Sequence, residues 1–240
     1  MKHLLDKPIG QIVTEDFRTA QVFKQHNIDF CCKGHHSLSE VASRKALDTD
    51  QILSELERVV AGQAEGIPDF KSWSLDVLAD HIEKKHHRYV EEKIPVLKAF
   101  LEKLCNVHGQ RHPELFEITG AFNASAGELT MHMKKEELLL FPIIRKMVKA
   151  SKEGTPPPAA PFGTVGNPIR VMMEEHETEG TRFEEIRALS NGYTPPEDGC
   201  TTYRVTFSML AEFEGDLHQH IHLENNILFP GAVELEETLS

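Results

Sequence analysis

The sequence predicts an all-α fold in which an up-down four-helix bundle follows a small helical N-terminal domain. Two observations carry this prediction. Beyond about residue 70, apolar residues recur at spacings of three, four and seven over long segments, as they do on the buried face of an α-helix. The segments are separated by stretches rich in Pro and Gly, such as SKEGTPPPAAPFGTVGNP, which show no periodicity and are typical of connections. Four antiparallel helices joined in this way form an up-down bundle.

Residues 1–66 are expected to form the small N-terminal domain. Thr14, Ser37 and Asp48 are side chains that commonly cap helices, and each precedes a segment with helical character. We therefore expect three short helices, with the stretch NIDFCCKGHH as a loop between the first and the second. Residues 62–68 are expected to form a linker.

Residues 70–240 are expected to form the bundle. A bend is predicted near Pro95, because proline removes a backbone hydrogen bond from a helix. The expected helices run from about residue 74 to 105, from 113 to 149, from 168 to 190 and from 201 to 226.

The overall composition excludes several classes of protein. The formal net charge of −12 argues against nucleic acid or an anionic membrane as the main partner. No apolar run is long enough to span a bilayer, and the first residues do not resemble a signal peptide, so we expect a cytoplasmic protein. The four cysteines are then expected to be thiols, and the absence of a CxxC pattern gives no sign of a zinc knuckle.

Two segments of the predicted bundle repeat one pattern. In the second predicted helix His132 is followed four residues later by Glu136, and in the fourth His220 is followed by Glu224. Phe-Pro follows nine and ten residues after each His. Residues four apart lie on one side of a helix, one turn apart, so each pair presents an imidazole and a carboxylate together.

Both pairs fall within apolar stripes. Leu210, Phe213 and Leu217 belong to the stripe that contains His220 and Glu224. An unpaired buried carboxylate costs several kcal/mol or takes up a proton. No Lys or Arg lies on either stripe, so a metal is the simplest partner, with a buried His–Glu hydrogen bond as the alternative. Fourteen histidines in the chain support a metal site rich in imidazole.

Further histidines extend the repeat. His87 lies 45 residues before His132, and His176 lies 44 residues before His220, so each helix pair offers a His on its first helix and HxxxE on its second. His81 and His86 fit this spacing only slightly worse. Two Glu and at least four His are too many ligands for one tetrahedral zinc, and they suit two iron ions with five or six ligands each.

Several motifs together resemble one known family. They are DFCCKG, HMKKEE followed by LLLFP, MEEHE, the TPP loop and HIHLENNILFP, and they extend over nearly the whole chain. The bundle resembles the hemerythrin-like domain, and the chain as a whole resembles the iron–sulfur cluster repair di-iron proteins, the RIC or ScdA/YtfE family, with an N-terminal ScdA-type domain. The resemblance implies two iron ions per chain, with Glu136 and Glu224 as bridging carboxylates. The ligands it implies are His87, His108, His132, Glu136, His176, His220 and Glu224, of which His108 could instead be an exposed loop residue.

Other polar residues near these positions are given lesser roles. His81 and His86 are expected to lie behind the ligands or on the surface. His218 and His222 flank His220 and point to other sides of the helix, so they are expected to be solvated. Glu175 is expected to be a surface residue, or else to line an access route.

Cys31 and Cys32 are the candidate reactive residues. The functional interpretation is a reactive or metal-transferring dithiol whose thiol pKa is lowered by nearby Lys33, His35 and His36. The alternative is that two small residues pack a tight loop. A homodimer in which the dithiol of one chain meets the bundle of the other is a further expectation.

The resemblance implies repair of iron–sulfur proteins damaged by nitrosative or oxidative stress. The repair would proceed by iron donation, by nitric oxide reductase-type chemistry at the di-iron site, or by both. The alternative is a non-catalytic hemerythrin-like module that senses or binds oxygen or nitric oxide. A third possibility is a zinc-loaded structural bundle whose N-terminal helices bind a protein partner.

Overall fold

The computed structural model describes residues 2–62, 68–157 and 159–239, and every regular element within these ranges is a helix. The only β-type pairing in this part of the chain is an isolated bridge between Pro8 and Ser37. The all-α prediction is therefore confirmed. Most of the predicted linker, residues 63–67, lies outside the described residues.

The N-terminal helices are held by the expected caps at two of three positions. Ser37 accepts a hydrogen bond from the backbone N–H of Glu40, and the Glu40 side chain accepts one from the backbone of Ser37. Asp48 accepts from two backbone N–H groups of the next helix. The helices are α1 (Ile9–Glu15), α2 (Ala20–Gln25), α3 (Leu38–Lys45) and α4 (Thr49–Ala61).

The predicted cap at Thr14 is wrong. Thr14 lies inside α1, which the sequence did not predict, and its hydroxyl donates to the carbonyl of Gly10 at 2.8 Å. Asp16 ends α1 and accepts from the backbone N–H of Arg18, so the chain turns there before α2 begins. Both Thr and Asp are good caps, and only the extended backbone at Asp16 decides between them.

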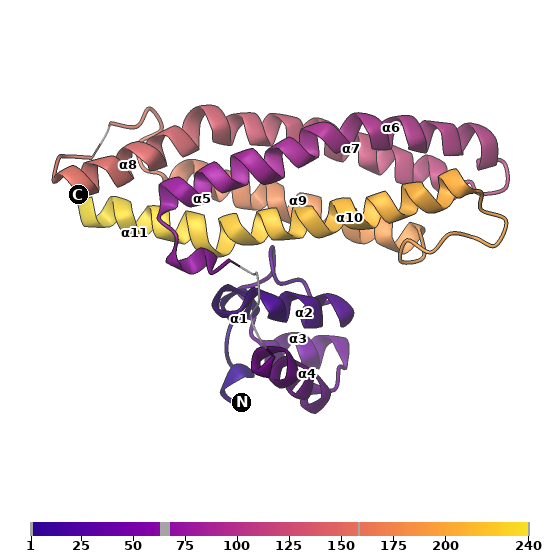
Figure 1. The fold of residues 1–240 in the computed structure, drawn as a ribbon, viewed down its shortest axis with the longest axis horizontal. Helices are drawn as coiled ribbons and strands as arrows, with labels where there is room; N and C mark the ends of the chain where they lie inside the picture. Colours follow the sequence, from indigo (N-terminus) through magenta and orange to yellow (C-terminus); the bar gives the residue numbers. More distant parts are fainter. Residues whose placement is uncertain (1, 63–67, 158, 240) are drawn as a thin grey trace.

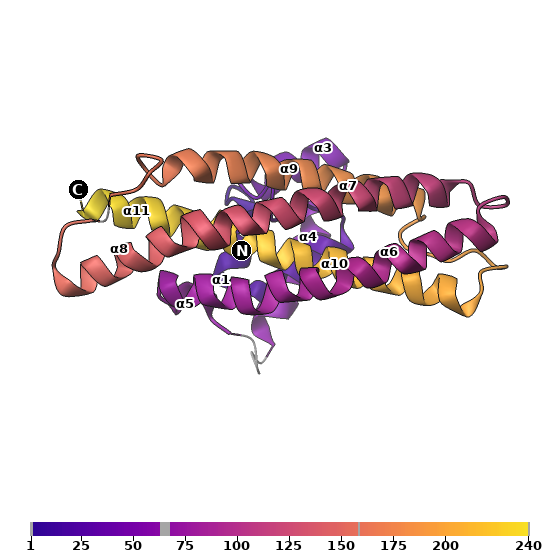
Figure 2. The same cartoon turned by 90° about the horizontal axis from the view of Figure 1, so that it is seen from above.

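Four long helical rods form the bundle, and the N-terminal domain lies beside the middle of their length (Figure 1). Seen from above, the rods run side by side (Figure 2). Helix α6 packs against α7 and α10, and α9 packs against the same two helices. In chain order the rods are α5 (Leu75–His81), η4 (Ile82–His87) and α6 (Arg88–His108); α7 (Glu114–Lys135), η5 (Glu136–Leu140) and α8 (Phe141–Glu153); α9 (Gly166–Leu189); and α10 (Thr201–Leu223), η6 (Glu224–Leu228) and α11 (Phe229–Leu239).

Three of the rods contain a π-helical segment, which the sequence did not predict. The segments are η4, η5 and η6, and they lie near the middle of the bundle. Pro95 lies inside α6, and the departure from α-helical hydrogen bonding comes earlier, in η4. The fourth rod continues past the predicted end at Asn226 to Leu239, because Pro230 lies in the first turn of α11, where a helix tolerates proline.

The core consists of two apolar clusters on either side of the π-helical segments. One combines the N-terminal domain with α6, α7, α10 and the end of α9, and the other combines α5, α8 and α11 with the start of α9. The predicted stripe residues Leu210, Phe213 and Leu217 are buried in the first cluster. Because this cluster includes residues of both domains, the N-terminal domain packs directly on the bundle.

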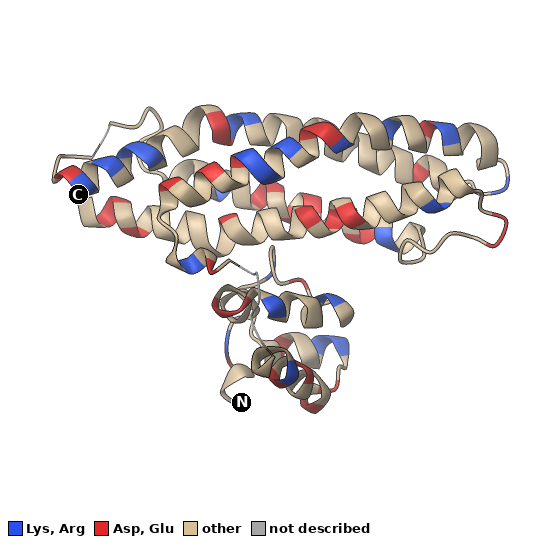
Figure 3. Cartoon of the chain, in the orientation of Figure 1, with Lys and Arg blue, Asp and Glu red and all other residues tan. Residues whose placement is uncertain are grey.

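Charged residues of both signs are interspersed along the bundle helices (Figure 3). No helix among the described residues is long and apolar enough to cross a membrane.

Candidate metal centre

Each HxxxE pair spans the junction between an α-helix and a π-helical segment. His132 lies in the last turn of α7, and Glu136 is the first residue of η5. His220 and Glu224 occupy the same positions in α10 and η6. In each pair the His Nε2 lies 3.2 Å from a carboxylate oxygen of the Glu. π-helical turns insert an extra residue and often occur at functional sites, because they change the direction of side chains.

The six side chains form two groups that share both carboxylates. His87 and His220 form one group with Glu136 and Glu224, and His132 and His176 form the other with the same two Glu residues. The potential ligand atoms of each group all lie within 4.8 Å of one another. Each group therefore draws one His from each half of the sequence repeat, and the shared carboxylates lie between the two groups.

The atoms that the six side chains direct toward one another lack the hydrogen bonds that buried polar groups normally have. None of them is more than 3% exposed. All four oxygens of Glu136 and Glu224, and the Nε2 atoms of His87 and His220, have no hydrogen-bond partner among the described residues. The Nε2 atoms of His132 and His176 face each other at 3.0 Å. Unpartnered polar atoms are rare inside proteins, and converging nitrogen and oxygen atoms without partners fit cations at both positions.

The outer ring nitrogens of three candidate ligand histidines lie within hydrogen-bonding distance of polar side chains. Glu137 lies 3.0 Å from Nδ1 of His87, and the amide oxygen of Asn225 lies 2.8 Å from Nδ1 of His176. A hydrogen bond donated by Nδ1 leaves the Nε2 lone pair free and fixes the ring orientation, which is the usual arrangement around protein metal sites. Behind the fourth ring, His220, the His86 ring is stacked at 5.7 Å with its Nδ1 3.0 Å from Asp216.

The sequence analysis missed Glu137 and Asn225, although the repeat contains them. Each directly follows the Glu of its HxxxE pair, and each holds the His of a neighbouring rod. Glu175 was expected on the surface or along an access route. Its side chain is half-buried and lines a cavity that reaches His132 and His176, with one oxygen 2.7 Å from Nδ1 of His132 and the other bound by Lys135.

The electrostatic environment of the centre is negative. Burial opposes ionisation of Glu224, but the nearby rings of His220 and His176 hold its pKa well below the ordinary value. Burial also opposes a charge on His132, yet Glu136 and Glu175 raise the pKa of that ring to about 10. Ionised carboxylates that raise the pKa of a buried imidazole in this way also attract a metal cation.

His108 does not join the other six candidates, contrary to the expectation. It lies at the C-terminal end of α6, with its Nε2 3.2 Å from the sulfur of Cys200 and its ring beside Tyr203. Since α6 begins just after His87 and rises ~1.5 Å per residue, His108 is about 30 Å away along the rod.

The expectation that His218 and His222 are solvated is also wrong. His222 is 1% exposed, and its ring lies 5.8 Å from the rings of both Phe17 and Phe30 of the N-terminal domain. His218 is half-buried beside Phe30. The sequence shows only that these side chains point away from the bundle core, whereas the structure shows that the N-terminal domain covers them.

The dithiol loop contacts the bundle of its own chain. The Cys32 thiol donates to the backbone carbonyl of the ligand His176 at 3.2 Å, and Gly180 of α9 leaves room for this approach. The Asn225 amide donates to the carbonyl of Cys31 at 3.3 Å. The dithiol therefore lies against the bundle of its own chain, and the dimer in which it meets the bundle of another chain stays a prediction.

The pKa of the Cys31 thiol is shifted in the direction opposite to the expected activation. The hydrogen bond to Cys32, burial and the neighbouring Asp29 raise the pKa of the Cys31 thiol well above its ordinary value. Lys33 is exposed and pairs with Glu184 at 3.7 Å, and His35 is exposed as well. Neither Lys33 nor the two histidines are among the groups that shift the pKa of the Cys31 thiol.

Three cavities lie around the centre and the dithiol. One of about 160 Å³ reaches His132 and His176 from the side of Glu175 and Lys135. One of about 350 Å³ is lined by both dithiol cysteines, Asn225 and Met173.

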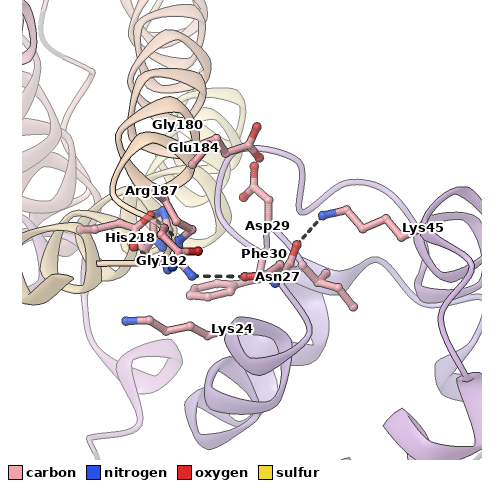
Figure 4. A pocket seen from close by; sticks show the side chains of 14 residues that line it. Lys24, Asn27, Asp29, Phe30, Lys45, Gly180, Glu184, Arg187, Gly192 and His218 are labelled. Atoms are coloured by element: carbon pink, nitrogen blue, oxygen red, sulfur yellow. Dashed lines mark hydrogen bonds and ion pairs between the residues drawn. The ribbon is translucent and has the colours of Figure 1, made fainter. Parts of the chain in front are cut away.

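The third and largest cavity, of about 600 Å³, lies between the N-terminal domain and the bundle. Across it Arg187 donates to the Asn27 side chain at 3.2 Å, Lys45 bonds the Asn27 carbonyl, and Asp29 of the dithiol loop lies at its edge (Figure 4). This cavity does not reach the metal ligands.

Two protein-family models match this chain, one over the N-terminal domain and the other over the bundle. Residues 5–60 match the ScdA N-terminal family, described as a domain of unknown function, and residues 78–232 match the hemerythrin HHE cation binding domain. Similar proteins named "Iron-sulfur cluster repair protein YtfE" occur in Dickeya chrysanthemi (35% identical, covering 96% of this chain and 98% of the relative) and in Pectobacterium atrosepticum (34%, covering 95% and 97%). A relative of the same name in Escherichia coli O81 is 33% identical, with the same two coverages of 95% and 97%.

Proposed function

This chain belongs to the YtfE family of iron–sulfur cluster repair proteins, and from that premise we propose that it binds two iron ions and repairs damaged iron–sulfur clusters. The damage would come from nitrosative or oxidative stress. The damaged iron–sulfur proteins are its partners under this proposal.

One observation carries the di-iron proposal. Two groups of four ligands share Glu136 and Glu224, and the carboxylate oxygens have no other partners. A carboxylate between two cation positions can bridge them, and imidazole with carboxylate is a donor set that suits iron. His87 and His220 would hold one ion, and His132 and His176 the other. Four protein ligands per position leave room for a small ligand on an ion that takes five or six.

Two iron ions would supply one-electron redox chemistry, including reduction of nitric oxide. Residues of the chain orient the proposed ligands and shield them from solvent. Glu137, Glu175 and Asn225 orient three imidazoles, and the buried position of all six ligands excludes bulk water.

The dithiol is proposed to take part in iron delivery. Cys32 lies against the backbone of His176, and both cysteines line a cavity that opens to the surface. A ferrous ion that is donated to a damaged cluster would pass the two sulfur atoms, which are good ligands for iron once they lose their protons. Asn225 links the dithiol loop to His176, because its amide oxygen bonds Nδ1 of His176 and its amide nitrogen donates to the carbonyl of Cys31.

The first test is elemental analysis of protein purified without oxygen, followed by a reactivation assay with a damaged iron–sulfur enzyme. We expect about two irons per chain and recovery of the damaged enzyme. One zinc per chain, or no recovery with two irons present, would contradict the proposal. A stable adduct with a diatomic gas and no recovery would instead favour the sensing module.

A second test separates the dithiol from the metal centre. The double variant Cys31→Ser/Cys32→Ser should keep its iron, because neither residue is among the proposed ligands, and should lose most of the cluster recovery. The matched control is Cys105→Ser, which lies elsewhere in the bundle and should behave like the unmodified protein. Full recovery with the double variant would refute the role of the dithiol.

A further inference from the structure

A cysteine and a histidine meet at the end of the bundle that is remote from the metal centre. Cys200 is the N-cap of α10, and His108 is the last residue of α6. The His108 Nε2 lies 3.2 Å from the Cys200 sulfur. The two residues are 92 positions apart in the sequence, so only the fold brings them together.

The Cys200 sulfur is accessible and lies at the positive end of a long helix. The residue is exposed, and α10 extends for 23 residues beyond it. The backbone N–H groups of Tyr203 and Thr202 lower the pKa of the thiol. Helix N-termini favour thiolate in this way, and thiolate is the reactive form of cysteine.

The His108 ring is directed at this sulfur and has no other polar partner among the described residues. It is only 5% exposed, and its Nδ1 has no hydrogen-bond partner. Tyr203 packs against the ring with the two centroids 5.4 Å apart. A buried imidazole whose single polar contact is a thiol forms the nucleophile and base pair that activates cysteines in other proteins.

The charged side chains around this pair form ion pairs with one another. His112 lies 3.1 Å from Glu114 and 2.9 Å from Asp198, and Arg111 pairs with Asp198 at 2.7 Å. These contacts fix the end of the loop before α10 against the turn after α6. The two nearby carboxylates are thereby compensated, and the cysteine on the neighbouring turn, Cys105, directs its sulfur to Thr119.

We propose that Cys200 and His108 form a reactive pair that exchanges with low-molecular-weight disulfides, so that Cys200 is a site of reversible mixed-disulfide modification. The Cys200 proton passes to Nε2 of His108, and the sulfur attacks one sulfur of the disulfide. A new bond forms between that sulfur and Cys200 as the original disulfide bond breaks. The leaving thiolate takes the proton from His108, so no further oxidant or reductant is needed.

The other cysteines do not offer this chemistry. Cys31 and Cys32 are 3% and 6% exposed, and Cys105 is half-buried without a histidine partner. The modification is therefore expected at one position, far from the metal ligands.

The test is the rate of mixed-disulfide formation with cystamine, a small disulfide, measured on the full metal-loaded protein by peptide mass spectrometry at a series of pH values. Cys200 should react at pH 7 about tenfold faster than the same residue in the urea-unfolded chain, with the midpoint of its pH–rate profile at lower pH. His108→Gln should lower the rate at pH 7 about fivefold or more and move the midpoint upward. The control His35→Gln, on the exposed loop of the N-terminal domain, should leave the rate unchanged.

Equal midpoints in the folded and unfolded chains would overturn the proposal, as would a His108→Gln variant that reacts like the unmodified protein. If His108→Gln does not fold, the comparison of the unmodified protein with its unfolded chain decides the question alone. Modification at Cys31 or Cys32 in preference to Cys200 would also overturn the proposal.

Discussion

Replacing Asn225 by leucine tests how the metal centre is held together. Leucine branches at Cγ as asparagine does, so at this site, where Asn225 is 8% exposed, the change replaces the two polar atoms of the amide by methyl groups. The change removes the acceptor for Nδ1 of His176 and the donor to the carbonyl of Cys31. Two separate effects follow from the two lost hydrogen bonds.

The first effect is on metal affinity. Without the amide oxygen, Nδ1 of His176 has no partner, and the ring is free to rotate or to change tautomer. Loss of such an outer partner usually weakens metal binding by 10- to 100-fold, which is about 1.4 to 2.7 kcal/mol. The second effect is on stability, because an unpaired buried carbonyl at Cys31 costs about 1–3 kcal/mol.

The assay for the first effect is competition between the protein and a ferrous chelator of known affinity, without oxygen. The second effect is measured as the free energy of unfolding in urea. The exposed Asn123 of α7 gives the matched control Asn123→Leu, which should change neither quantity.

A second variant separates the two effects. Asn225→Asp keeps an acceptor for His176, as Glu137 does at the equivalent position for His87, but it loses the donor to Cys31. It should therefore bind metal about as well as the unmodified protein and still lose stability. If Asn225→Leu binds iron with unchanged affinity, the amide does not orient His176, and the reasoning about outer partners is refuted.

Three further predictions concern stability. Phe213→Ala should lower the free energy of unfolding by about 3–5 kcal/mol in urea denaturation, because the ring is 1% exposed and packs against Phe122 and Phe183; a loss below 1 kcal/mol would contradict its central place in the core. Burial lowers the pKa of His222 to about 4, so the folded state binds a proton less readily than the unfolded state, and stability is complete above the ordinary value of 6.5 and falls as the pH drops from there towards 4. Between pH 7.5 and pH 5, the free energy of unfolding of the His222→Gln variant should therefore fall by about 2 kcal/mol less than that of the unmodified protein, in the same assay. Parallel pH profiles of the two proteins would show that His222 is not buried in solution. Ser37→Ala removes one half of a capping box and should cost about 1 kcal/mol, measured as a lower melting midpoint, whereas the exposed Ser43→Ala should cost less than half of that.

The sequence by itself determined the long helices, and its repeat predicted the six candidate ligands that the structure brings together. Long helices follow from the spacing of apolar residues, which depends only on the helical repeat. The HxxxE pairs could be recognised because a carboxylate and an imidazole on a buried stripe need a partner, and no basic residue of the stripe provides one. The caps at Ser37 and Asp48 were predictable for a similar reason, since their hydrogen bonds are local.

The tertiary structure decided which histidines belong together and what surrounds them. The repeat predicts a His and an HxxxE pair in each half of the bundle, but it does not predict which of them group together. In the structure each group takes one His from each half, because α6 packs against α10 and α7 packs against α9. The π-helical segments were not predictable from periodicity, since they depend on contacts between rods. His222 is buried, and Cys32 reaches His176, only because the N-terminal domain packs on the bundle. His108 shows the same limit, since the resemblance implies that it is a ligand while the 21 residues of α6 carry it to the other end of the bundle, beside Cys200.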